Sequence, residues 1–238
     1  MKTFVMIPTY NERENIRNLI DKILKLKIGN LHVVVADDSS PDGTSQIVKD
    51  ISGKSKNVHL LLRTKNKGRG SAGRDGFIYC LKKGADIIVE MDGDMSHDPM
   101  YIPAMIKELR NADLVIGSRR VEGGKETGRS IFRRFVTWGA NLYIMAMLGI
   151  KVKDCNSGFR CFKRKVLESI NPERLESKGP AIVQEVLFKA HLKGFRIKEI
   201  PITFANRTKG HSKLGIPQLA AGYFMVLKLK IQHLLGMI

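Results

Sequence analysis

Short apolar runs alternate with segments of helical periodicity along the first half of the chain, and this alternation limits the possible folds more than any other feature. The runs cover residues 3–7, 31–36, 58–62, 87–91 and 114–116, are rich in Val and Ile, and are bounded by turn residues. Continuous apolar runs of this length are typical of strands buried on both faces of a parallel sheet. Helical spacing appears at residues 16–24 and in segments that start near residues 43, 70 and 99. We therefore predict a doubly wound, mostly parallel α/β sheet.

The second half of the chain is less regular. We predict helices over residues 129–148, 183–192 and 216–238, the last of them amphipathic, and short strands over 197–200 and 202–205 on either side of Pro201. Asn11 is the predicted cap of the first helix. Because no linker interrupts the chain, we expect one domain over residues 1–215, divided near residue 118, and an accessory helix over 216–238.

An acidic segment, Asp92-Gly93-Asp94, directly follows the fourth apolar run. Ligands of doubly wound sheets bind at the carboxyl ends of the strands, which places both carboxylates at the predicted ligand edge. Oxygen ligands of this kind suit Mg²⁺ or Mn²⁺, which complete their coordination with water and substrate phosphates. The alternative is a solvated acidic turn, since a lone Asp-x-Asp is a weak signal.

Two further polar loops end neighbouring strands. Asp37 is placed to accept hydrogen bonds from a base or ribose, and Tyr10 offers a ring for stacking beside the Glu12 carboxylate. Turn and cap duty is the alternative for both loops. The glycines at 68, 70 and 73 lack the spacing of the phosphate-binding loop of NTPases, so we interpret them as a tight turn with close helix packing.

Positive charge is concentrated in the second half. The formal net charge is +18, and residues 117–238 carry 23 Lys and Arg against 8 Asp and Glu. Such an excess favours an anionic partner: a phosphorylated ligand, an acidic membrane or nucleic acid. The three cysteines form no CxxC pair, which disfavours a disulfide scaffold or structural zinc. We also expect no signal peptide, and no apolar run reaches the ~18–20 residues of a membrane-spanning helix.

Several stretches, in this order along the chain, resemble the family 2 glycosyltransferases of the GT-A fold, and within them the dolichol-phosphate mannose synthases. The stretches are residues 7–12, 37–44, 91–97, 117–119, 156–160 and 201–204, followed by Arg207, Gly210, Ser212 and Lys213. Each is generic alone, but their order and completeness are specific. The resemblance extends from residue 1 to about residue 214, with residues 1–118 as the nucleotide-sugar half and 119–215 as the acceptor half.

The resemblance also implies roles for individual residues. The implied nucleotide-sugar site consists of Pro8, Tyr10, Glu12, Val35, Asp37, Asp92, Gly93, Asp94, Arg119, Arg207 and Lys213. The implied metal ligands are Asp92, Asp94 and Ser96, and the implied catalytic residues are Asp94, Arg119 and Arg207. The implied acceptor-phosphate residues are Arg133, Arg134 and Thr137. As a departure from the family pattern, Thr137-Trp138 stands where Ser-Arg is common.

The implied reaction is transfer of mannose from GDP-mannose to a dolichyl or polyprenyl monophosphate, with inversion, supported by Mg²⁺ or Mn²⁺. The implied location is peripheral, on the cytoplasmic face of a membrane, and a small transmembrane subunit is a candidate partner. A polyprenyl-phosphate glucosyltransferase that uses UDP-glucose is an alternative with the same fold.

A basic nucleic-acid-binding module is an alternative of a different class. The sequence has no helix-turn-helix or zinc-finger spacing, and without a metal the paired carboxylates would repel a phosphate backbone. We therefore expect no nucleic-acid partner. A non-catalytic membrane scaffold gives no reason for acids at adjacent strand ends.

Overall fold

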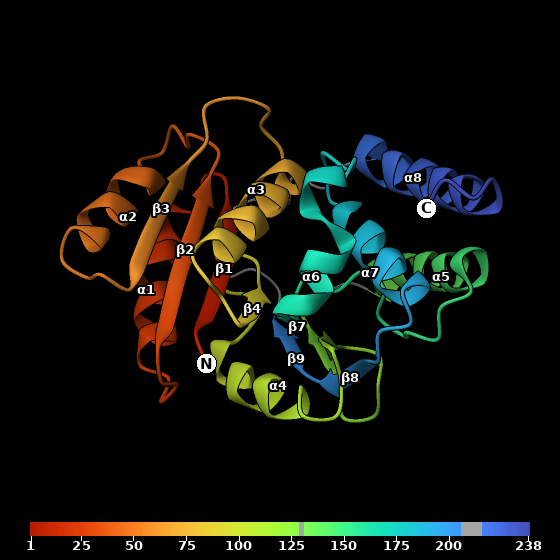
Figure 1. Cartoon of the computed structure of the whole chain (residues 1–238), viewed down its shortest axis with the longest axis horizontal. Coiled ribbons are helices and arrows are strands. Elements are labelled where there is room, and N and C mark those ends of the chain that lie inside the picture. The colour runs from red at the N-terminus through yellow and green to blue at the C-terminus, as the bar shows by residue number, and fades with distance from the viewer. Residues whose placement is uncertain (129–130, 206–215) are drawn as a thin grey trace.

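A seven-stranded sheet runs through the middle of the molecule (Figure 1). The computed structural model describes residues 1–128, 131–205 and 216–238, without the side chains of residues 131–134 and 216–220. In spatial order the strands are β3 (Val58–Leu62), β2 (Leu31–Asp37), β1 (Thr3–Thr9), β4 (Ile87–Glu90), β7 (Arg160–Lys163), β5 (Leu114–Ser118) and β8 (Ile197–Pro201). Only β7 is antiparallel to its neighbours among these strands, so the predicted mostly parallel α/β sheet is confirmed.

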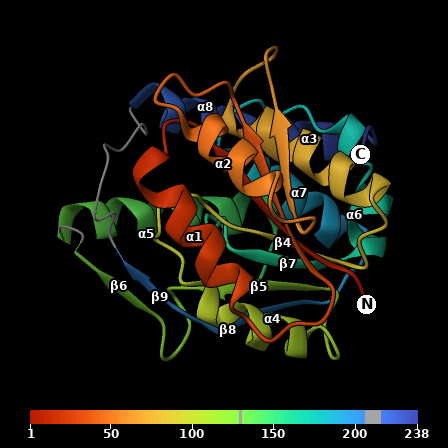
Figure 2. The same cartoon turned by 90° about the vertical axis from the view of Figure 1, so that its left-hand side faces the viewer.

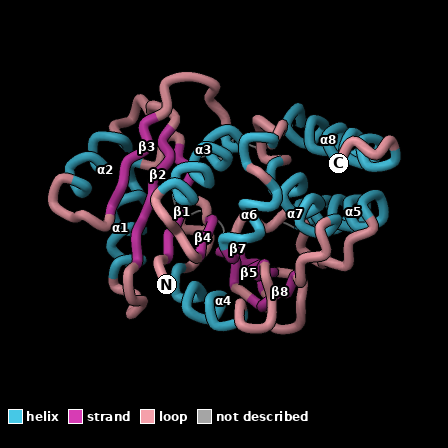
Figure 3. Tube along the Cα trace, viewed as in Figure 1, coloured by secondary structure: helices cyan, strands magenta, loops and turns pink. Residues whose placement is uncertain are grey.

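Helices cover both faces of the sheet, as Figure 3 shows for strands in magenta between helices in cyan. One face packs against α1 (Arg13–Leu24), α2 (Thr44–Ser52) and α4 (Ile102–Glu108). The other face packs against α3 (Arg69–Lys82), α6 (Arg164–Ile170) and α7 (Ile182–Leu192). Successive strand residues point to opposite faces, so Phe4 and Met6 join one core while Val5 and Ile7 join the other. Figure 2 shows α1 and α2 on the side of the molecule facing the viewer.

Two long helices, α5 (Ile131–Leu148) and α8 (Ile216–Leu234), lie at the end of the molecule away from α1 and α2 (Figure 1). They contact each other through Tyr143 and Tyr223, whose ring centroids are 5.1 Å apart. Gln232 Nε2 of α8 also donates to Glu176 Oε1 at 3.0 Å, and Lys228 pairs with the same carboxylate. Within the described residues, no helix is long and apolar enough to cross a membrane.

The remaining elements are short. A second sheet pairs β6 (Lys125–Thr127) with β9 (Thr203–Ala205). There are also two 3₁₀ turns: η1 (Pro99–Tyr101) directly precedes α4, and η2 (Pro172–Arg174) follows α6. The strands predicted in the first half are all present, whereas β7 was not predicted. The predicted cap of α1 is wrong: Asn11 adopts a left-handed φ of 57°, and the capping position is Glu12.

The predicted close packing of the glycine turn is confirmed. Gly70 N donates to Lys178 O at 2.8 Å at the start of α3. A Cβ at Gly70 would lie 2.2 Å from Ser177 O, so only glycine allows the two backbones to approach this closely.

Candidate active site

A cavity of about 740 Å³ opens where the parallel strands end. One side is lined by the loops that follow β1, β2, β4 and β5, and the other side by residues of α5, α7 and α8. Small-molecule sites usually have about 300–1,000 Å³ and lie at this edge of doubly wound sheets. The cavity therefore joins the polar strand ends to the two long helices.

Asp94 is fixed on the loop after β4. Its carboxylate is almost fully buried and accepts hydrogen bonds at Oδ1 from Ser96 N, at 3.0 Å, and from Ser96 Oγ, at 2.5 Å. Met95, between them, has a left-handed φ of 64°, which turns the loop back toward Asp94. Ser96, a predicted metal ligand, thus orients the Asp94 carboxylate in this structure.

Gly93 allows this loop to pack against the loop after β1. A Cβ at Gly93 would lie 3.0 Å from Thr9 Cγ2 and 3.4 Å from Glu12 Cγ. Because real side-chain contacts are rarely this short, a larger residue would push the two loops apart. The two strand ends that the sequence predicted as parts of one site are therefore in direct contact.

Asp92 is bound to a cation that the sequence did not assign to the site. Arg69 Nη2 donates to Asp92 Oδ1 at 3.1 Å, and Arg69 Nη1 donates to the buried Glu90 Oε1 at 2.7 Å. Burial alone lowers the pKa of Arg69, but the two carboxylates raise it above its ordinary value. Gly158 packs against the Asp92 carboxylate, since a Cβ at Gly158 would be 3.4 Å from both Asp92 carboxylate oxygens.

His97 packs against two aromatic rings and accepts a hydrogen bond from the backbone of the acidic loop. Its ring stacks on Phe159 with a centroid distance of 5.1 Å and meets Phe204 edge-on at 5.4 Å. Its Nδ1 accepts a hydrogen bond from Asp92 N at 3.3 Å. Burial lowers the pKa of His97, which keeps the imidazole neutral and suited to accept this bond.

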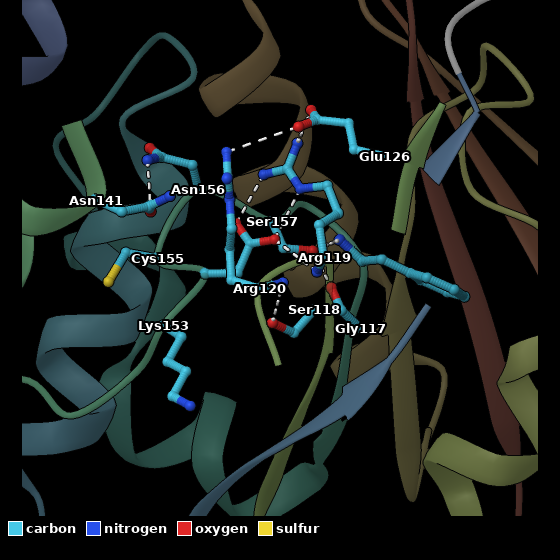
Figure 4. Close-up of polar contacts among 12 residues, drawn as sticks. Gly117, Ser118, Arg119, Arg120, Glu126, Asn141, Lys153, Cys155, Asn156 and Ser157 are labelled. Atoms are coloured by element: carbon cyan, nitrogen blue, oxygen red, sulfur yellow. Dashed lines mark hydrogen bonds and ion pairs between the residues drawn. The ribbon is translucent and has the colours of Figure 1, made fainter. Parts of the chain in front are cut away.

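Arg119 follows β5 and lines the cavity, where Asp154 holds it in a two-pronged ion pair. Arg119 Nε donates to Asp154 Oδ2 and Arg119 Nη2 to Asp154 Oδ1, both at 2.7 Å. Burial by itself lowers the pKa of Arg119, but Asp154 raises it above the ordinary value. Arg119 and Arg120 also lie 3.7 and 3.6 Å from the Glu126 carboxylate. Figure 4 shows both side chains directed toward Glu126. Sequence reasoning did not identify Asp154, which lies two residues before the recognised 156–160 stretch.

The predicted nucleoside residues divide into two groups. Tyr10, Glu12 and also Pro8 line the cavity. Val35 is fully buried in the core, and the Asp37 carboxylate accepts from Thr9 Oγ1 at 2.9 Å and from Ser40 Oγ at 2.6 Å. Neither is among the cavity-lining residues.

The neighbouring acid, Asp38, lines the cavity instead of Asp37. Asp38 accepts from Gly68 N at 2.7 Å and pairs with Arg63. The strand register therefore points the second acid of the pair, and not the first, at the cavity edge.

The predicted cations of the acceptor half are only partly described. Arg207 and Lys213 lie outside the described residues, and so do the side chains of Arg133 and Arg134 on α5. Thr137, one turn further along α5, lines the cavity. Of the predicted site, the structure thus brings together the residues of the β1, β4 and β5 ends with Thr137.

The donor set of the acidic loop fits a divalent metal ion with an open coordination sphere. Asp92 and Asp94 both line the cavity and offer carboxylate oxygens, the ligands that Mg²⁺ and Mn²⁺ prefer. Within the described part of the chain, no group of three His, Cys, Asp or Glu residues could hold an ion. An ion here would therefore take its other ligands from water and from the phosphates of a bound nucleotide.

Comparison with known proteins identifies the family. The model of glycosyl transferase family 2 matches residues 4–170. The chain is 39% identical over 215 residues to the undecaprenyl-phosphate mannosyltransferase of Micrococcus luteus, covering 90% of this chain and 88% of that protein. It is 35% identical to the polyprenol monophosphomannose synthase of Mycolicibacterium smegmatis, covering 94% and 85%. It is 38% identical to the dolichol-phosphate mannosyltransferase of Pyrococcus furiosus, covering 90% of this chain and 59% of that protein.

A solved structure supports the same fold. Glucosyl-3-phosphoglycerate synthase from Mycobacterium tuberculosis, in complex with Mn²⁺, uridine diphosphate and phosphoglyceric acid, superposes with a TM-score of 0.68 at 21% sequence identity. The alignment covers 98% of this chain and 78% of that one. The family match and the three relatives together show that this chain belongs to glycosyl transferase family 2.

Proposed function

We propose that the protein transfers mannose from GDP-mannose to a dolichyl or polyprenyl monophosphate, with inversion at the anomeric carbon. The observation that carries this proposal is the cavity that connects the paired aspartates to the apolar surfaces of α5 and α8. A nucleoside diphosphate would bind beside the paired aspartates, and a lipid phosphate would bind beside the apolar surfaces of α5 and α8. The relatives named above, whose names describe mannose transfer to lipid phosphates, favour the same pair of substrates.

The donor occupies the polar end in this proposal. Asp92 and Asp94 would hold Mg²⁺ or Mn²⁺, which neutralises the charge that develops on a departing diphosphate. Tyr10 and Glu12 lie at the end of β1, where they are suited to bind the nucleoside. Arg119 presents a guanidinium that Asp154 holds in place, so its position is fixed before the donor binds. Arg207 and Lys213 are proposed further phosphate ligands.

The acceptor occupies the other end. Val136, Ala140 and Ile144 of α5 and Val226 of α8 line the cavity with apolar side chains. A lipid monophosphate carries its second negative charge at neutral pH, because its second pKa is near ~6. Its oxygen can therefore attack the anomeric carbon without a strong general base, and the protein's task is to position two polyanions. Arg133, Arg134 and Thr137 are the proposed ligands of the acceptor phosphate.

The outer surfaces of α5 and α8 suit a membrane interface. Large apolar side chains are exposed along both helices and in the residues after α8: Phe135, Trp138, Leu142, Phe224, Leu227, Ile231, Leu234, Leu235 and Met237. Helices with exposed apolar side chains and nearby Lys or Arg bind in the headgroup region. We propose that α8 acts as an accessory membrane helix beside a catalytic unit over residues 1–215. We place the protein on the cytoplasmic face, with a small transmembrane subunit as a candidate partner.

A transfer assay tests the proposal. Radiolabelled GDP-mannose and a short polyprenyl phosphate are incubated with the protein and Mn²⁺, and the organic phase is analysed for a mannosyl lipid. We expect a lipid product from the unmodified protein and none from Asp94→Ala. Turnover of UDP-glucose without turnover of GDP-mannose would select the glucosyltransferase alternative, and near-normal turnover by Asp94→Ala would refute the metal assignment.

A further inference from the structure

Three side-chain amides form a hydrogen-bonded relay at the wall of the cavity. Asn141 belongs to α5, Gln184 to α7, and Asn156 to the loop that precedes β7. Gln184 Nε2 donates to Asn156 Oδ1 at 2.5 Å, and Asn156 Nδ2 donates to Asn141 Oδ1 at 2.8 Å. Asn156 and Gln184 line the cavity, and Figure 4 shows Asn141 next to Asn156. The reaction as described above uses none of the three.

The relay leaves polar atoms without partners at both of its ends. Asn141 and Gln184 are 97% and 92% buried, with exposed fractions of 3% and 8%. Asn141 Nδ2 and Gln184 Oε1 have no hydrogen-bond partner among the described residues. Flipping all three amides would reverse the relay but would again leave one donor and one acceptor unpaired. Buried polar groups are normally paired, so these ends call for a ligand.

The backbone around the relay is held rigidly. Arg160 is fully buried, and its guanidinium donates to Cys155 O at 3.0 Å and also to Val183 O. It thereby ties the residue before Asn156 to the residue before Gln184. Ser157 Oγ donates to Gly117 O at 2.6 Å, which fixes the same loop to the end of β5. The amides are therefore preorganised, as a selective site requires.

The relay also lies close to the acidic loop. Gly158, two residues after Asn156, is packed against Asp92, with 3.4 Å between its virtual Cβ and the carboxylate oxygens. On the other side, Val183 and Ile144, near Gln184 and Asn141 in the sequence, line the apolar part of the cavity. Asn156 and Gln184 therefore line the same cavity as Asp92 and the apolar side chains, and the transferred sugar must lie in this cavity between the proposed diphosphate and the proposed lipid phosphate.

We propose that Gln184 and Asn156 bind hydroxyl groups of the transferred sugar and select its identity, with Asn141 as a positioning residue. This inference rests on the proposed function. A sugar hydroxyl both donates and accepts, so it can satisfy an unpaired donor or an unpaired acceptor. A phosphate offers only acceptors and would be bound by cations, and a polyprenyl chain offers neither. A sugar epimer with a misplaced hydroxyl leaves the buried amides unpaired, which is how a polar site rejects an analogue.

Binding and turnover of Gln184→Met test this inference, because methionine keeps the side-chain length but removes both polar atoms. With Mn²⁺ present, calorimetry should give a GDP affinity within about twofold of the unmodified protein, whereas GDP-mannose should bind about 10-fold more weakly. The preference for GDP-mannose over GDP-glucose in kcat/KM should fall by about 10-fold. Gln46 is an exposed residue of α2, and Gln46→Met is the matched control. It should change neither the GDP-mannose affinity nor the sugar preference.

Equal weakening of GDP and GDP-mannose, or an unchanged sugar preference, would overturn the inference. Asn156→Ser provides the same readouts if Gln184→Met does not fold, since Asn156 is only partly buried. If the unmodified protein binds no GDP-mannose, the proposed donor is wrong. The relay is then tested with UDP-glucose against UDP, and a selective loss of the sugar-bearing ligand would still support it.

Discussion

Asp154→Asn tests how strongly the cavity wall depends on a buried ion pair. Asp154 is fully buried and Arg119 is nearly so, and their contact has two bonds of 2.7 Å. The amide keeps the shape of the carboxylate but removes its charge, so the Arg119 guanidinium loses its two short ion-pair bonds and keeps the longer contact to Glu126 at 3.7 Å. Removing one partner of a buried pair costs about 3–5 kcal/mol, and an amide that still accepts one bond places this variant near ~3 kcal/mol. For a chain of this size, that loss corresponds to a fall in Tm of about 6–12 °C.

The matched control is Glu168→Gln, which breaks an exposed pair of similar length. Arg164 Nε lies 2.7 Å from Glu168 Oε1, but the two side chains are 36% and 49% exposed. Exposed pairs contribute about 0–1 kcal/mol, so urea unfolding at pH 7 should separate the two variants clearly. If Asp154→Asn costs no more than Glu168→Gln, Asp154 does not anchor Arg119.

The pH dependence of Asp154→Asn gives a second readout. Burial alone raises the pKa of Asp154, but the bonds from Arg119 outweigh this effect and hold the pKa below its ordinary value. A depressed carboxyl pKa stabilises the folded state above the unfolded pKa of about 4, and this contribution is lost as the pH falls through the folded pKa. The stability difference between the unmodified protein and Asp154→Asn should therefore be largest near pH 7 and smaller at acidic pH.

Three further predictions concern other parts of the molecule. Burial lowers the pKa of His59, so folding stability should fall as the pH drops below about 6.5, and His59→Gln should reduce that slope in thermal melts between pH 8 and 5. Gly70→Ala should cost about 1–3 kcal/mol in urea unfolding because its Cβ would lie 2.2 Å from a backbone oxygen. Gly139→Ala, with nothing within 4 Å, should instead stabilise α5 by about 0.5–1 kcal/mol, and a loss there equal to that of Gly70→Ala would contradict the packing argument. All three cysteine thiols are buried with raised pKa values and should resist alkylation by iodoacetamide until the protein is unfolded.

The parts of the fold that the sequence predicted are those with local signals. Strands β1, β2, β4 and β5 follow from continuous apolar runs because both faces of these strands are buried, and the apolar run of β3 was found in the same way although this edge strand is only partly buried. Strand β7 is only four residues long and begins and ends with a basic residue, so it gives no such signal. The charge of Arg160 is accommodated by backbone carbonyls from distant segments, such as Val183 O, which the local sequence does not reveal.

In the candidate site, too, residues with a local sequence signal were predicted, and residues that depend on distant partners were not. Asp92 and Asp94 were predicted because they follow a strand end, and Arg119 because the resemblance to family 2 glycosyltransferases implies it. Asp154 and Arg69 were not, since their importance depends on partners 35 and 23 residues away in the sequence. Asp38 lines the cavity where Asp37 was expected, because side chains alternate along a strand and adjacent acids point in different directions.

Calorimetric titration of GDP with and without Mn²⁺ tests most directly whether the paired aspartates hold the cation that binds the donor. We expect Mn²⁺ to tighten GDP binding to the unmodified protein by at least about 10-fold, because an ion held by Asp92 and Asp94 would offset the negative charge of the diphosphate. Asp92→Asn and Asp94→Asn should each lose this enhancement while they still fold and keep the weak metal-free binding. An Mn²⁺ enhancement of unchanged size in both variants would contradict the account.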